Sequence, residues 1–214
     1  PLLSLLVLAA AGASGAQLTT YDGACDASAA IALDGQHFIV GNDETNVLAL
    51  HRRGQPARVG SVPLDGFLGL GGKDEADIEG AAAVGARVYW ITSHARDRKG
   101  RAQPGRQRLF ATEVVPGPPP TVAAVGKPYL KLLEDMLAAP SLSAYALAAA
   151  TRRAAEAAGG FNIEGLAATP DGRLLIGLRN PLPQGRALVI PLDNPGMLEK
   201  ARARPDQVRK VLDT

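Results

Sequence analysis

The sequence has only one cysteine in 214 residues, which excludes a disulfide framework and any zinc site built from several cysteines. Aromatic residues make up only 4%, and the formal net charge is only +2, too weak to indicate nucleic acid as a partner. Hydrophobic residues nevertheless reach 46%, so the chain can bury a core. With 24 glycines and 16 prolines, it favours many short elements joined by turns.

Complete catalytic motifs are also absent. The sequence contains neither the Gly-x-Ser-x-Gly elbow of serine hydrolases nor the His-Glu-x-x-His helix of zinc proteases. The segment 66–74 resembles a phosphate-binding loop, but Asp74 stands where Ser or Thr would bind Mg²⁺. Any activity must therefore come from residues that the fold brings together.

The first sixteen residues form an apolar run that ends in small residues. No charge precedes Asp22, and Ser14 and Ala16 fit the small-x-small rule of signal peptidase. We therefore interpret 1–16 as the remnant of a signal peptide, with 17–214 as a partial mature domain, and expect a periplasmic or secreted protein without a membrane anchor. The alternative is a buried apolar N-terminal helix.

One pattern occurs three times along the chain. An apolar run of small residues, a tight turn of the Asp-Gly or Gly-Ala type and a second apolar run together predict a β-hairpin. The three hairpins are expected at 26–43, 77–94 and 162–180. The sequence Ile-Glu-Gly-x-Ala recurs at 78–82 and 163–167, which supports a true repeat over chance similarity.

Each hairpin is followed by two further strand candidates. Third strands are expected at 46–51, 107–114 and 186–192, and fourth strands at 57–62, 121–125 and 208–213. Four antiparallel strands in each repeat are typical of β-propeller blades, here about 26–62, 77–125 and 162–213. The sequence thus predicts an all-β β-propeller, and an ordinary β-sandwich is the alternative.

A stretch at about 128–158 interrupts this pattern and is predicted to be a helical insertion. Leu130, Leu133 and Leu137 recur at helical spacing. A second helix is expected over 141–158, with Ser141 as its N-cap and Gly159 at its end. Three blades cannot close a ring, so we expect the three to be part of a larger ring that missing C-terminal blades complete.

Several motifs, taken in order, resemble the bacterial domain-of-unknown-function family numbered 3616. The segments that carry the resemblance are 21–30 (YDGACDASAA), 75–80 (EADIEG), 90–94 (WITSH), 162–167 (NIEGLA) and 179–183 (RNPLP). More distantly, the Ile-Glu-Gly-Leu-Ala run is similar to the phytase-like and esterase-like propellers, which are exported and in some cases calcium-dependent hydrolases. The resemblance supports the fold and implies no established activity.

Strand geometry selects one end of the blades as the candidate site. In an antiparallel hairpin the start of the first strand lies beside the end of the second, so polar residues at both places should meet at one channel mouth. The strand starts supply Asp26, Asp77, Glu79, Asn162 and Glu164, and the strand ends supply Asp43, His94, Arg179 and Asn180.

We expect this polar cluster to bind metal or ligand. Hard oxygen donors suit Ca²⁺, so Asp77, Glu79 and Glu164 are the candidate metal ligands. The candidate ligand-binding residues are Asp26, Asp43, Arg96, Asn162, Arg179 and Asn180. The alternative for Glu79 and Glu164 is a structural role, in which their carboxylates accept hydrogen bonds from the backbone of a neighbouring blade.

A basic loop follows the second hairpin and is expected to overhang the same mouth. Its cationic residues could bind a phosphoester, or they could form a solvated loop tip. They are Arg96, Arg98, Lys99, Arg101, Arg106 and Arg108. Beside a metal, Glu79 would act as general acid or base and His94 as proton shuttle.

Two function classes stay open at this point. The first is a metal-assisted hydrolase of an anionic ester, with Ca²⁺ as the candidate cofactor. The second is a propeller that binds a small anionic ligand or a protein partner without catalysis.

Overall fold

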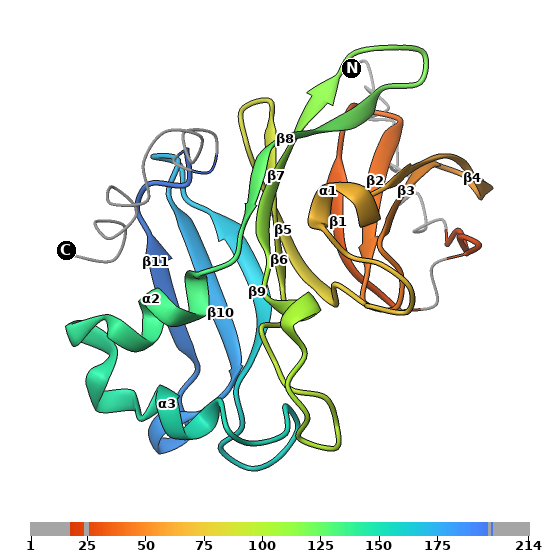
Figure 1. Cartoon of the computed structure of the whole chain (residues 1–214). Helices are drawn as coiled ribbons and strands as arrows, with labels where there is room; N and C mark the ends of the chain where they lie inside the picture. Colours follow the sequence, from red (N-terminus) through yellow and green to blue (C-terminus); the bar gives the residue numbers. More distant parts are fainter. Residues whose placement is uncertain (1–17, 24–25, 197, 199–214) are drawn as a thin grey trace, which may run out of the picture.

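The computed structural model describes residues 18–23, 26–196 and 198, and these residues form a mostly β structure (Figure 1). Three antiparallel sheets of four, four and three strands stand side by side, and helices are few and short. None of these three sheets closes on itself within the described residues. The predicted all-β main body with three sheets is confirmed.

The first sheet follows the chain order β1-β2-β3-β4. Its strands are β1 (Ala27–Ala32), β2 (His37–Asn42), β3 (Val47–Arg52) and β4 (Gln55–Pro63). A single turn of helix, α1 (Asp65–Leu68), leads from it to the second sheet.

The second sheet has the same order, β5-β6-β7-β8. Its strands are β5 (Ile78–Val84), β6 (Arg87–Thr92), β7 (Leu109–Val115) and β8 (Thr121–Tyr129). The Gly85–Ala86 turn joins β5 and β6, and the φ angle of 60° at Gly85 shows why the turn needs glycine. The loop between β6 and β7, with the short 3₁₀ helix Pro104–Arg106, is the one that carries the basic residues.

The third sheet has three described strands in the order β11-β10-β9. They are β9 (Asn162–Ala168), β10 (Leu174–Asn180) and β11 (Leu188–Leu192). Its expected fourth strand at 208–213 lies outside the described residues, as does the apolar segment 1–16 interpreted as a signal peptide.

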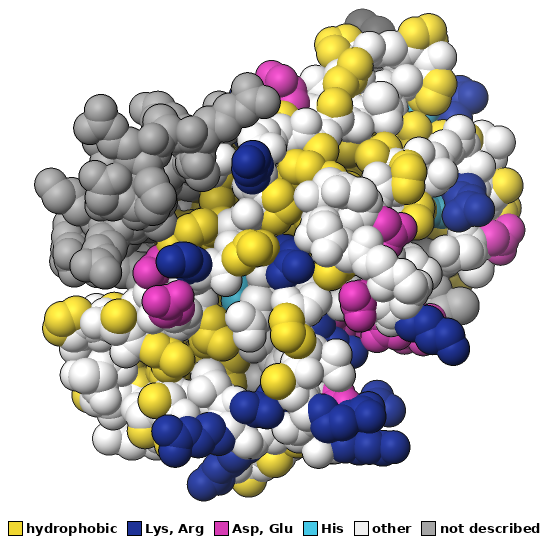
Figure 2. Space-filling model, in the orientation of Figure 1, with side chains coloured by type: hydrophobic (Ala, Val, Ile, Leu, Met, Phe, Trp, Pro, Cys, Tyr) yellow, Lys and Arg dark blue, Asp and Glu magenta, His cyan; other side chains and the backbone are white. Residues whose placement is uncertain are grey.

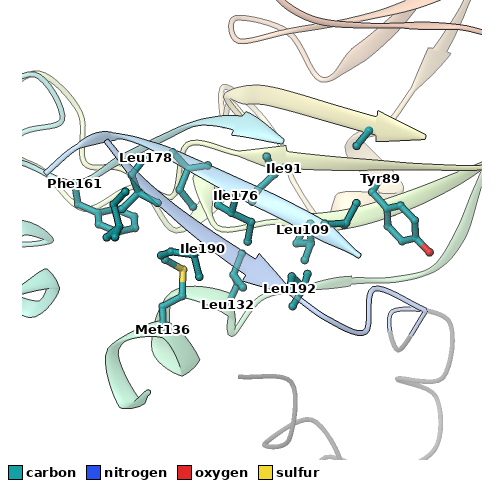
Figure 3. Packing of buried hydrophobic residues seen from close by; sticks show 14 of the residues in the cluster. Tyr89, Ile91, Leu109, Leu132, Met136, Phe161, Ile176, Leu178, Ile190 and Leu192 are labelled. Carbon is teal, nitrogen blue, oxygen red and sulfur yellow. The ribbon is translucent and has the colours of Figure 1, made fainter. Parts of the chain in front are cut away.

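Two apolar cores hold the three sheets together. Between the first and second sheets, Ile39, Leu48, Trp90 and Phe110 are fully buried. A larger core lies between the second and third sheets, where the helix α2 (Leu132–Ala138) also packs. Figure 3 shows Met136 of α2 beside Ile190 of β11. The second sheet is packed on both faces, because alternate side chains of its strands point in opposite directions into the two cores.

The predicted helix over 141–158 is wrong. The chain instead forms a 3₁₀ segment (Pro140–Tyr145) and one α-helical turn, α3 (Leu147–Ala150), separated by Ala146 with a left-handed φ of 52°. Ser141 caps no helix. Alanine favours helix, but a short helix needs an apolar face to pack, and in α3 only Leu147 and Ala150 are buried. Helical structure in the 128–158 insertion is confined to 132–150, because β8 extends to Tyr129.

Among the described residues, no helix has the length and apolar character needed to cross a membrane.

Candidate functional site

A cavity of about 570 Å³ opens at the end of the molecule where β5 and β9 begin. Acidic and basic side chains both line it. From the residues selected in the sequence, it contains Asp43, Asp77, Glu79, Arg96, Asn162, Glu164 and Arg179. Lys and Arg side chains gather at the lower end of the molecule in Figure 2, where the loops after β6 and α3 lie in Figure 1.

Hairpin register brings these residues together. Ile78 of β5 pairs with Thr92 of β6, and Asn162 of β9 pairs with Asn180 of β10. Backbone hydrogen bonds then link the two hairpins, because the N–H of Ser93 donates to Asp77 and the N–H of Ile163 donates to Ser93. Residues at strand starts and strand ends therefore surround one space.

Three carboxylates lie unusually close together in this cavity. Asp43, Asp77 and Glu79 each offer an oxygen, and these oxygens all lie within 4.8 Å of one another. We call these three residues the carboxylate trio. Glu164, expected as a metal ligand from the sequence, lines the same cavity but is not one of them.

Burial and mutual repulsion perturb the trio. Burial, followed by the negative charges of Asp77 and Glu164, raises the pKa of Glu79 to about 8. A hydrogen bond with Ser28 opposes this shift only in part. Burial is also the main reason that the pKa of Asp43 is raised, with the charge of Asp26 as the next cause. Without a counter-ion, the trio holds a proton at neutral pH.

Asp77 is fixed by its own partners and by its backbone. Its φ of 62° is left-handed, a conformation that costs energy in a residue other than glycine. The Ser93 hydroxyl donates to Asp77 Oδ2, and Arg106 Nη1 donates to the same oxygen at 2.8 Å. Burial still raises the pKa of Asp77 above its ordinary value, and these two partners oppose that shift.

Two buried oxygens at the cavity have no donor among the described residues. They are Oδ1 of Asp43 and Oδ1 of Asn162. Asn162 is only 6% exposed, and its Nδ2 donates to Glu164 Oε1 at 2.8 Å, which leaves its carbonyl oxygen free to accept. A buried acceptor without a donor is costly, so both oxygens indicate a missing cation or hydrogen-bond donor.

Glu164 belongs to a second arrangement in the same cavity. Arg179 Nη1 donates to Glu164 Oε1 at 2.7 Å, and this ion pair raises the pKa of Arg179. The pair is partly exposed, so it contributes little to stability. Among the described residues, the other N–H groups of Arg179 have no hydrogen-bond partner.

The basic loop divides into structural and accessible side chains. Arg108 is 9% exposed and donates to the carbonyls of Leu68, Pro104 and Gln107, so it braces the loop. Arg96 and Lys99, by contrast, line the cavity. Arg96 donates only to the carbonyls of Thr151 and Gly100, and Lys99 has no ion-pair partner among the described residues.

His94 does not line the cavity, contrary to the expectation that it shuttles protons there. It is 3% exposed, and its Nδ1 donates to the carbonyl of Thr92 at 2.8 Å. Burial lowers the pKa of His94 to about 4, so the ring is neutral at pH 7. Its Nε2 is buried without a partner among the described residues. A side chain buried in this way cannot reach a molecule in the cavity, so the structure does not support the expected role of His94 as a proton shuttle.

Two other expected residues lie beside the cavity and do not line it. Asp26 is exposed and accepts a backbone hydrogen bond from Asp43 through its carbonyl. Asn180 donates from Nδ2 to the carbonyl of Ala155. The role of Arg106 as the partner of Asp77 has no signal in the sequence, because the two residues are separated by 29 positions and no local pattern links them.

Comparison with protein families gives one match. A model described as "Protein of unknown function (DUF3616)" matches residues 26–111 and 131–203. No curated protein matches the chain.

Proposed function

The chain belongs to the DUF3616 family of proteins of unknown function, and from the cavity we propose that it binds a divalent cation and hydrolyses an anionic ester. The carboxylate trio would hold the cation, and the basic side chains of the same cavity would hold the ester. The family match leaves the activity open, so the proposal depends on the geometry of the site.

The observation that carries the proposal is the closeness of the trio. Three carboxylate oxygens within 4.8 Å of one another repel strongly in a partly buried site, unless a proton or a cation lies between them. Among the described residues, Arg106 forms an ion pair with one of the three, Asp77, and its charge also lowers the pKa of Asp43 in part. A divalent cation would remove the remaining repulsion.

The donor atoms favour Ca²⁺ over a transition metal. All three side chains of the trio offer oxygen, and the unpartnered Oδ1 of Asn162 belongs to the same cavity. Ca²⁺ accepts six to eight such ligands in flexible geometry, whereas zinc prefers nitrogen or sulfur.

The cationic side of the cavity favours an anionic substrate. Arg96 and Lys99 line it and have no carboxylate partner in the described part of the chain, whereas Arg179 has one. Arginine and lysine are the usual partners of phosphate and carboxylate groups. A phosphoester or another anionic ester would thus lie between these cations and the trio.

Glu79 is the proton acceptor in this proposal. A bound cation would make a water more acidic, and it would also keep Glu79 in the carboxylate form that can accept the proton. Water would attack the ester carbon or phosphorus while Glu79 takes its proton. The leaving alkoxide would then receive that proton, which balances the hydrolysis.

We also propose that the three sheets belong to a β-propeller and that the protein is exported. The repeated order of the three sheets, with β1, β5 and β9 adjacent in space, supports their interpretation as blades of a β-propeller that further blades complete. The apolar run at 1–16 supports export to the periplasm or beyond. A resemblance to phytase-like and esterase-like propellers would agree with the propeller fold and with export.

A second candidate function has its own observation in its favour. The expected proton shuttle, His94, is buried away from the cavity. A protein that binds an anion together with a cation, without turning it over, needs no such residue. This non-catalytic binding role, with a small ligand or a protein partner, is the alternative.

Thermal unfolding during a Ca²⁺ titration tests the cation. A ligand that binds only the native state raises the melting temperature, so Ca²⁺ should raise that of the wild type and not that of Asp43→Asn. Absence of any shift at millimolar Ca²⁺ would overturn the cation. Turnover on phosphoesters and carboxyl esters then separates the two functions. Turnover that Glu79→Gln abolishes supports the hydrolase, whereas Ca²⁺ binding without turnover favours the alternative.

A further inference from the structure

The basic loop that follows β6 is held in one shape by a single carboxylate. Oδ1 of Asp97 accepts hydrogen bonds from the backbone N–H groups of Lys99 and Arg101. Its Oδ2 accepts from the side chains of Arg101 and Gln103. The backbone closes the same turn, because the N–H of Gly100 donates to the carbonyl of Asp97 at 2.8 Å. Hydrogen bonds to an ionised group are strong, so this loop presents its cationic side chains from a fixed backbone.

The guanidinium of Arg96 is oriented by two backbone carbonyls. Its Nε donates to the carbonyl of Thr151 at 2.7 Å, and its Nη1 donates to the carbonyl of Gly100 at 3.0 Å. Thr151 follows α3, and Figure 1 shows this segment beside the loop after β6 at the lower end of the molecule. An ion pair between Arg98 and Glu156, at 3.3 Å, also links the two segments. Carbonyls fix the position of the Arg96 guanidinium without neutralising its charge.

Two positive charges of the cavity are left without a carboxylate partner in the described part of the chain. They belong to Arg96 and to Lys99, which is exposed and lines the same cavity. Both come from one turn, since Gly100, which accepts from Arg96, directly follows Lys99. The other cations that line the cavity pair with carboxylates: Arg98 with Glu156, Arg101 with Asp97, Arg106 with Asp77 and Arg179 with Glu164.

The unpaired charges and donors match a tetrahedral oxyanion better than a carboxylate. Two of the five N–H groups of Arg96 are used by carbonyls, so three remain, and the ammonium of Lys99 adds three. A phosphate monoester carries a charge of about −1.5 to −2 at neutral pH and has three acceptor oxygens. A carboxylate has one charge and two oxygens. The reacting group of a carboxyl ester is neutral and would use neither cation.

The remaining lining of the cavity agrees with a hydrophilic ligand. Among the described residues that line it, only Ala95 and Ala155 are apolar, and none is aromatic. A large acyl or aromatic group would therefore find no apolar surface to cover.

We propose that Arg96 and Lys99 form a preformed site for a tetrahedral oxyanion, so that the ester bound in this cavity is a phosphate or sulfate ester and not a carboxyl ester. The choice of ester rests on the proposed function, whereas the anion site itself needs no bound cation. Within this site Arg96 determines specificity, and the segment after α3 positions it through the carbonyl of Thr151.

Isothermal titration calorimetry tests the anion site on the whole chain, after dialysis to remove divalent cations. The probes are inorganic phosphate, sulfate and acetate at constant ionic strength and neutral pH. Phosphate or sulfate should bind about tenfold or more tightly than acetate. The tighter of the two identifies the class of ester. Acetate binding as tight as that of phosphate and sulfate overturns the proposal, and so does the absence of binding by both.

Substitutions then locate the site. Arg96→Gln and Lys99→Gln should each weaken binding of the tighter probe by about tenfold. Arg96→Lys keeps the charge but cannot reproduce the planar fork, so it should restore binding only in part. Arg58→Gln is the control for the loss of one positive charge, because Arg58 is exposed on β4 and does not line the cavity. Equal affinities in Arg96→Gln, Lys99→Gln and Arg58→Gln would overturn the assignment.

Two features keep this test decisive. Lys99 makes no side-chain hydrogen bond among the described residues, so Lys99→Gln should keep the wild-type melting temperature even where Arg96→Gln lowers it. Because the titrations contain no divalent cation, failure of Ca²⁺ to bind would leave the anion site intact. Conversely, a chain that binds Ca²⁺ and hydrolyses carboxyl esters but binds neither phosphate nor sulfate would keep the proposed function and lose this inference.

Discussion

Arg106 and Asp77 form an ion pair in which Nη1 of the guanidinium lies 2.8 Å from Oδ2 of the carboxylate. Asp77 is also one of the carboxylate trio, so this arginine occupies an oxygen that a divalent cation would use. A second nitrogen of Arg106 lies 3.2 Å from Glu75, which holds the guanidinium in place. Arg106 is therefore an internal counter-ion that would compete with a bound divalent cation for Asp77.

Replacement of this counter-ion should strengthen cation binding. Arg106→Gln removes the charge and leaves Asp77 free, so we expect Ca²⁺ to bind about fivefold to tenfold more tightly, the equivalent of about 1 kcal/mol. Isothermal titration calorimetry measures the change. Arg98→Gln is the control, because Arg98 lines the same cavity but pairs with Glu156, which is not a member of the trio. Equal affinities in both variants would show that Arg106 does not compete.

The candidate metal ligands expected from the sequence differ from the carboxylate trio by one residue, and mutation can decide between the two. The trio contains Asp43, whereas the sequence favoured Glu164. Asp43→Asn should lower Ca²⁺ affinity at least tenfold, and Glu164→Gln should change it less than threefold, because Glu164 is engaged by Arg179. Calorimetric titration of both variants decides between them. The reverse order of effects would restore Glu164 as a ligand.

The raised pKa of Glu79 predicts how stability depends on pH. Because this pKa is about 8 in the folded chain and near 4.5 when unfolded, the folded state binds more protons between these values. In the presence of a chelator, which removes divalent cations, the melting temperature should therefore fall as pH rises from about 5 to about 8. Glu79→Gln should flatten this slope, and saturating Ca²⁺ should reduce it. A melting temperature that rises with pH over this window in the wild type but not in Glu79→Gln would contradict the assignment.

Gly80 should be among the least tolerant positions of the fold. Gly80→Ala places a methyl group 2.8 Å from the backbone nitrogen of Leu166, and neither strand can yield without disturbing the apolar core beside it. We expect a loss of about 2–3 kcal/mol in the free energy of unfolding. Chemical denaturation checks this value. The equivalent change at Gly165 is the control, since its Cβ meets nothing closer than 3.6 Å.

Local patterns in the sequence predict the hairpins because the forces that form them are local. Alternating apolar residues around Gly85 and around Asp171–Gly172 allow one pairing register, since a one-residue slip would expose the core face. The same alternation places Asp77 and Glu79 on one side of the chain at a strand start. The strands β1 to β3, β5 to β7 and β9 to β11 accordingly lie within a few residues of the predicted ranges.

Tertiary structure alone decided what those residues face. Asp43 joins Asp77 because two different hairpins pack together, and Arg106 reaches Asp77 across 29 positions. His94 is removed from the cavity by a left-handed φ of 54° and a hydrogen bond to Thr92, neither of which has a sequence signature. The Ala-rich segment at 141–158 has helical propensity, yet its packing allows a single α-helical turn. Periodicity fixed the strands, whereas contacts between distant segments fixed the charges, the partners and the access of the site.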